Sequence, residues 1–122
     1  MLEFFMEGGW GMWPVSVFGL VMLGSAARYA WDIEPTRLRF VIAMGVLLVC
    51  TMTHATLTDL AAVFSCVSDP ARAPSDEVGR ILFIGLKEST RPGVLGGAFL
   101  TLSLVMVAVG VFRDGRRELS QV

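Results

Sequence analysis

FVIAMGVLLVCTMTHATLTDLAAVF, residues 40–64, is long enough to cross a bilayer as one helix, because about 20 apolar residues span the hydrocarbon. Its second half also carries polar side chains that hydrocarbon solvates poorly: Thr51, Thr53, His54, Thr56, Thr58 and Asp59. Side chains of this kind are expected to face protein or water. The stretch therefore predicts a membrane protein with several spans, one of which is lined by polar groups.

The composition of the whole chain supports this class. Its 122 residues are 54% hydrophobic, which is too apolar for an ordinary soluble domain, and the chain is too short for two domains. We therefore expect a single membrane domain over residues 1–122. Ten Lys and Arg residues stand against eleven Asp and Glu residues, so there is no basic surface for nucleic acid, and we exclude that partner.

Two further stretches of 20 uncharged residues, 8–27 and 93–112, flank the central one. Glu34-Pro35 should break the helix between the first two spans, and the prolines of residues 66–77 indicate an aqueous loop. Apolar residues recur at helical spacing over 78–89. We predict an all-α membrane protein with three transmembrane helices, at about 11–30, 39–65 and 92–113, and a short amphipathic helix before the third. Residues 66–91 form the outside loop in this prediction.

The distribution of basic residues sets the expected orientation. Six arginines fall on one side of the predicted membrane: Arg28, Arg37, Arg39, Arg113, Arg116 and Arg117. Four basic residues fall on the other side: Arg72, Arg80, Lys87 and Arg91. Because cytoplasmic segments are enriched in Lys and Arg, we expect the N-terminus outside and the C-terminus inside.

The polar residues of the central helix are the first functional candidates. Cys50, Thr53 and His54 share one face by their i, i+3 and i+4 spacing, and a neutral imidazole in a membrane helix can relay protons or bind a cation. The alternative is that the threonines bond to carbonyls one turn earlier and that His54 bonds to a neighbouring helix. Asp59 lies about 140° around the helix from His54, so the two do not form one site unaided. It could instead reach water or pair with an arginine of the loop.

Other features of the sequence point to packing and not to catalysis. Gly93, Gly96 and Gly97 begin the third span, and small residues let helix backbones approach, so we expect them to form a packing surface. No phosphate-binding loop, paired nucleophile or metal-type cluster is present. Cys50 and Cys66 fit no metal-binding spacing and are expected to be small buried residues. The sequence therefore predicts no enzyme, no cofactor and no metal.

Three local patterns resemble the MotA/TolQ/ExbB proton-channel family. Residues 4–20, FFMEGGWGMWPVSVFGL, resemble the GG-x-x-M-x-P entry to that family's first helix. Residues 55–64, ATLTDLAAVF, look like its GTV-x-G-L-I-x-A-F segment, with Thr56 on the family's threonine and Phe64 on its phenylalanine. Residues 85–89, GLKES, followed by Gly96, look like its approach to the last helix.

This resemblance implies a subunit of a bacterial inner (cytoplasmic) membrane. It would assemble with copies of itself, as a pentamer by resemblance, around a single-span partner similar to ExbD or TolR. Proton flow beside the ring's threonines would energise an envelope process, and Thr56 would line the pore together with Thr53, His54 and Asp59. The chain departs from the family by lacking the large cytoplasmic insertion, by carrying Gly93 at a threonine position, and by carrying Asp59 at a glycine position.

Two other functions remain open from the sequence. The first is a scaffold or assembly subunit that does not conduct ions but retains the same helix packing. The second is a small transporter in which His54 is the proton site. A Thr56→Val change separates conduction from scaffolding, and a His54→Ala change tests the transporter.

Overall fold

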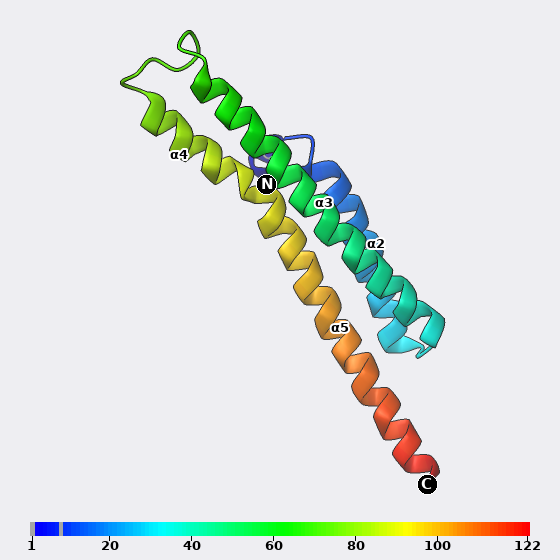
Figure 1. Ribbon diagram of the computed structural model, residues 1–122. Helices are drawn as coiled ribbons and strands as arrows, with labels where there is room; N and C mark the ends of the chain where they lie inside the picture. The colour runs from blue at the N-terminus through cyan, green and yellow to red at the C-terminus, as the bar shows by residue number, and fades with distance from the viewer. Residues whose placement is uncertain (1, 8) are drawn as a thin grey trace.

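The structure, a computed structural model, describes residues 2–7 and 9–122, and all the regular secondary structure of these residues is helical. The five helices are α1 (Leu2–Glu7), α2 (Met12–Trp31), α3 (Pro35–Ser68), α4 (Val78–Ser89) and α5 (Arg91–Gln121). Figure 1 shows α2 running beside α3, α4 folded back along the far end of α3, and the end of α5 projecting beyond the α2–α3 turn. The molecule is therefore an elongated bundle. Gly8, which belongs to the first motif of the resemblance, lies outside the described residues.

The helix boundaries follow from the prolines and the loop composition. Only Asp32, Ile33 and Glu34 separate α2 from α3, as the Glu34-Pro35 break predicts, and Pro35 occupies the first turn of α3. Proline is tolerated in a first turn because the N–H groups there have no partner within the helix. The prediction of an amphipathic helix over 78–89 is confirmed by α4.

Two helices are longer than predicted. α3 begins at Pro35 and ends at Ser68, whereas the predicted span was 39–65. α5 continues to Gln121, whereas the predicted span was 92–113, so the polar tail after residue 113 is helical. The basic residues of that tail are good helix formers, and they extend the helix without a break. At 34 and 31 residues, α3 and α5 are about 51 Å and about 46 Å long, more than one hydrocarbon thickness.

Two segments are long and apolar enough to cross a membrane: Pro35–Ser68 and Val78–Gln121. Only 17% of the most apolar window of each is buried, whereas the core helix of a soluble protein is mostly buried. Their apolar side chains therefore lie on the outside of the bundle, where lipid would cover them. The third predicted span, α2, is not one of these segments, because Arg28, Pro14 and Tyr29 lower its mean hydropathy. A membrane crossing by α2 stays a prediction.

Small residues allow α2 and α5 to pack closely. Gly96, Ser103 and Gly110 recur every seven residues along α5 and are all buried, Gly96 against α3 and Gly110 against α2. A Cβ atom added to Gly110 would lie 2.5 Å from the Tyr29 ring of α2, so only glycine fits there. In the same way, the absence of a side chain at Gly19 of α2 leaves space for the Phe99 ring of α5. These close contacts fix the register between the two helices.

The three glycines at the start of α5 have different surroundings within the chain. Gly96 is buried against Met52 of α3. At Gly93 and Gly97, an added Cβ would meet no described atom within 4 Å. By the helical period, these two positions lie about 60° and about 100° around α5 from Gly96, which turns them away from α3.

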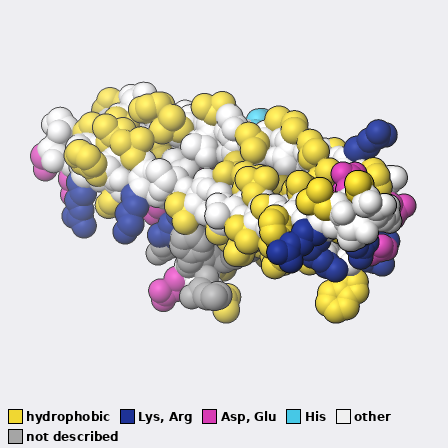
Figure 2. All heavy atoms as spheres, turned by 90° about the horizontal axis from the view of Figure 1, so that it is seen from below, with side chains coloured by type: hydrophobic (Ala, Val, Ile, Leu, Met, Phe, Trp, Pro, Cys, Tyr) yellow, Lys and Arg dark blue, Asp and Glu magenta, His cyan; other side chains and the backbone are white. Residues whose placement is uncertain are grey.

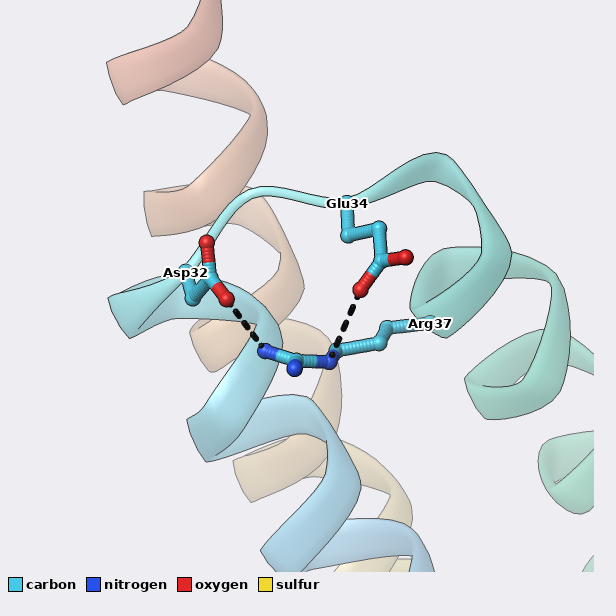
Figure 3. A network of polar contacts seen from close by, with 3 residues as sticks. All are labelled: Asp32, Glu34 and Arg37. Atoms are coloured by element: carbon cyan, nitrogen blue, oxygen red, sulfur yellow. Dashed lines mark hydrogen bonds and ion pairs between the residues drawn. The ribbon is translucent and has the colours of Figure 1, made fainter.

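Polar contacts hold the end of the bundle at the α2–α3 turn. Arg37, in the first turn of α3, lies 2.9 Å from the Asp32 carboxylate and 3.3 Å from the Glu34 carboxylate (Figure 3). Arg113 of α5 donates a hydrogen bond to the backbone carbonyl of Ala30, at the end of α2. Arginine suits this place because the last carbonyls of a helix have no partner within it and carry the negative end of the helix dipole. The turn is thereby tied to all three long helices.

Candidate functional site

The polar residues of α3 lie on two different sides of the helix. Thr53 and His54 are exposed, as is Cys50 one turn earlier, so the three share an exposed face of α3, and Cys50 also borders a groove that Met22 of α2 and Leu100 of α5 line. The prediction that Cys50 is buried is wrong. Figure 2 shows hydrophobic side chains exposed over much of the visible face of the molecule, interrupted by groups of Lys and Arg. We call the surface formed by Cys50, Thr53 and His54 the outward polar face.

The threonine hydroxyls are mostly used within α3 itself. Thr51 donates to the Leu47 carbonyl at 2.8 Å, and Thr53 donates to the Val49 carbonyl at 2.9 Å. Thr58 donates to the His54 carbonyl at 2.9 Å. These bonds confirm the part of the alternative in which threonines bond one turn back along the helix. The other part, a bond from His54 to a neighbouring helix, is not found among the described residues.

Thr56 and His54 differ from the other polar residues of this stretch. Within the described part of the chain, neither the Thr56 hydroxyl nor the His54 imidazole makes a hydrogen bond. Thr56 is half-buried and His54 is exposed. Their polar atoms are therefore available to a group outside this chain.

Asp59 lies on the other side of α3. A Cβ atom added to Gly9 would lie 3.7 Å from the Asp59 Oδ1 atom, so the carboxylate sits against the turn between α1 and α2. Gly9 has a φ of +69°, in the left-handed region that glycine adopts without strain. The structure thus keeps Asp59 and His54 apart, as their separation of about 140° around the helix predicts.

Asp59 has an acidic neighbour that the sequence analysis did not identify. Glu88 of α4 lines the same cavity as Asp59, and both side chains are half-buried. A signal for this pairing was present in the loop between α3 and α4. Residues 59 and 88 are equally distant from its centre at residues 73 and 74, so an antiparallel hairpin places them side by side. Gly85 and Val63, which pack against each other, obey the same rule.

The chemistry available at these positions is limited. Among residues 2–7 and 9–122, no three His, Cys, Asp or Glu side chains are grouped so as to hold a metal ion. Cys50 and Cys66 are both free thiols. The arrangement offers an imidazole and hydroxyls on one side of α3, and a pair of carboxylates beside an apolar cavity on the other.

Comparisons with known proteins do not extend this description. No family model matches the chain, and no match was found among curated proteins or solved structures. The resemblance to the MotA/TolQ/ExbB family therefore rests on the three short motifs alone.

Proposed function

We propose that this protein is an integral membrane subunit in which α2, α3 and α5 each cross the bilayer, and that it assembles with copies of itself through the outward polar face of α3. By its resemblance to the MotA/TolQ/ExbB family, we further propose that protons move along α3 in the assembly. A single-span partner similar to ExbD or TolR would complete the path.

The observation that carries the proposal is the exposure of His54. Residues 40–58 carry no Asp, Glu, Lys or Arg and extend for about 28 Å, close to the thickness of the hydrocarbon. His54 lies within this stretch, and its side chain is exposed on the surface of its own chain. Ionisable residues at membrane depth almost always face protein or a water-filled space. Another subunit or a partner supplies that environment more readily than lipid.

The expected orientation also fits the position of the basic residues. Arg37 lies in the α2–α3 turn, and Arg113 reaches the end of α2 beside it. Placing this end at the cytoplasmic surface satisfies the preference of Lys and Arg for that side. The N-terminus and the α3–α4 hairpin would then lie outside.

The second candidate, a scaffold that does not conduct ions, is favoured by the threonine hydrogen bonds. Three of the four hydroxyls between residues 51 and 58 already donate to the α3 backbone. Conduction would therefore depend on Thr56 and His54, the two groups whose polar atoms are available. Scaffolding requires neither of them to exchange protons.

The native mass of the complex, extracted gently from its own membrane, tests assembly. We expect a homo-oligomer with a co-purifying single-span protein, and a bare monomer would contradict the proposal. Proton flux into vesicles that contain the complex separates the two functions. Thr56→Val should abolish flux while the mass is unchanged, and Thr51→Val serves as the matched control because its hydroxyl is used within the helix.

A further inference from the structure

A partly open cavity lies between the two helices of the α3–α4 hairpin, on the side of α3 opposite the outward polar face. Its volume is about 390 Å³, within the range of about 300 to 1,000 Å³ that is usual for small-molecule sites. The walls are formed by apolar side chains of both helices, among them Ala62 and Val63 of α3 and Ile81 and Ile84 of α4. Gly9 closes one end. Three separate segments of the chain thus build the cavity.

Two carboxylates, Asp59 and Glu88, line the cavity, and Asp59 lies beside Gly9. Neither takes part in an ion pair within the described residues. The basic residues nearest in sequence, Lys87 and Arg91, are not among the described residues that line the cavity. The described lining of the cavity therefore carries negative charge, while most of its surface is apolar.

We propose that this cavity binds an organic cation with an apolar body, such as a quaternary ammonium or phosphonium compound. The charge is complementary, because a cationic centre between Asp59 and Glu88 would be attracted to two carboxylates in a partly desolvated site. The apolar walls would cover the body of the ligand and contribute in proportion to the apolar area removed from water. A bare metal ion fits less well, because it requires more ligands than two carboxylates provide.

The position of the cavity supports this class of ligand. Asp59 is the first charged residue after the uncharged stretch at 40–58, so the cavity lies at the level where hydrocarbon gives way to water. Amphiphilic cations concentrate at that level because their charged and apolar parts are both accommodated there. The cavity is also partly open, so that a ligand can enter from the membrane surface without unfolding the hairpin.

Binding of tetraphenylphosphonium to the full chain in a neutral detergent tests the proposal by calorimetry. We expect saturable binding that Asp59→Asn and Glu88→Gln each weaken by about tenfold. Asp76→Asn, in the exposed part of the α3–α4 loop, is the matched control and should leave the affinity unchanged. Glu88→Gln gives an independent result should Asp59→Asn impair folding. Triphenylphosphine oxide, which is neutral and similar in shape, should bind at least tenfold more weakly than the cation.

Cys66 reports where the probe binds, because it lines the same cavity. In a Cys50→Ser background, tetraphenylphosphonium should slow alkylation of Cys66 by a maleimide, and Glu88→Gln should remove this protection. The proposal is overturned when the cation does not bind, when the neutral compound binds equally well, or when both carboxylate variants retain full affinity. Protection of Cys66 by a basic apolar peptide but not by the phosphonium would also overturn it in favour of a protein partner.

Discussion

Arg113 of α5 donates a hydrogen bond to the backbone carbonyl of Ala30, in the last turn of α2. The two residues are 83 positions apart in sequence, so this contact joins the last long helix to the first at the end of the bundle. The bond involves a charged donor and the unpaired carbonyl of a helix terminus, which makes it stronger than a neutral hydrogen bond.

Replacing Arg113 by alanine should therefore lower the free energy of unfolding by about 1.5 to 3 kcal/mol, the usual contribution of a hydrogen bond to a charged group. Thermal unfolding in detergent, followed by circular dichroism, measures this change. Arg117→Ala is the matched control, because Arg117 is exposed on the projecting end of α5. Equal unfolding temperatures for the two variants would mean that the Arg113 bond contributes nothing.

The close approach of α2 and α5 gives a second prediction. A Cβ atom on Gly19 would collide with the ring of Phe99, so Gly19→Val should separate the helices and destabilise the bundle by about 1 to 3 kcal/mol. Gly24→Val, on the same helix, is the control because an added Cβ there meets no described atom within 4 Å. Thermal unfolding of the two variants in the same detergent compares them. Destabilisation by Gly24→Val alone would contradict the packing described for α2.

Ser103 gives a third prediction, of the opposite sign. Its hydroxyl is fully buried and has no hydrogen-bond partner among the described residues. Ser103→Ala should raise the free energy of unfolding by about 1 to 3 kcal/mol, since it removes the penalty of an unsatisfied buried group. Ser89 is equally buried, but its hydroxyl donates to the Gly85 carbonyl at 2.8 Å, so Ser89→Ala should not stabilise the protein. If neither variant raises the free energy of unfolding, the Ser103 hydroxyl has a hydrogen-bond partner and the prediction is wrong.

His54 provides the fourth prediction, on assembly. His54→Leu should shift the native mass toward the monomer. The proposal places the His54 imidazole against a second subunit, and leucine cannot make the polar contact that the imidazole makes there. Thr101→Val is the control, since Thr101 is also exposed but its hydroxyl donates to the Gly97 carbonyl within α5. A higher oligomer fraction for His54→Leu would indicate that lipid, and not protein, surrounds this side chain.

Much of the helical framework is predictable because its signals are local. The uncharged stretches, the Glu34-Pro35 break and the apolar spacing over 78–89 each depend on a few neighbouring residues. The lengths of α3 and α5 were underestimated, because the end of an apolar stretch marks a change of environment and not the end of a helix. Pro35 begins α3 four residues before the predicted start of the span, and α5 continues to Gln121.

The candidate site is less predictable because the pairing of its residues depends on how the helices pack against one another. The separation of His54 from Asp59 follows from the helical period alone. The pairing of Asp59 with Glu88 requires the hairpin, and the difference between Gly96 and its neighbours Gly93 and Gly97 requires the position of α3. These relationships arise from packing between segments distant in sequence, which a local pattern does not encode.

Crosslinking of Cys50 in the native membrane tests most directly the claim that copies of this protein meet at the outward polar face of α3. Cys50 lies on that face and is a free thiol, so no new residue is required. In a Cys66→Ser background, mild oxidation should convert most of the protein into a disulfide-linked dimer. The matched control carries Val105→Cys as its sole cysteine, on the exposed surface of α5, and should remain monomeric. Equal crosslinking of the two proteins, or none at Cys50, would contradict the account.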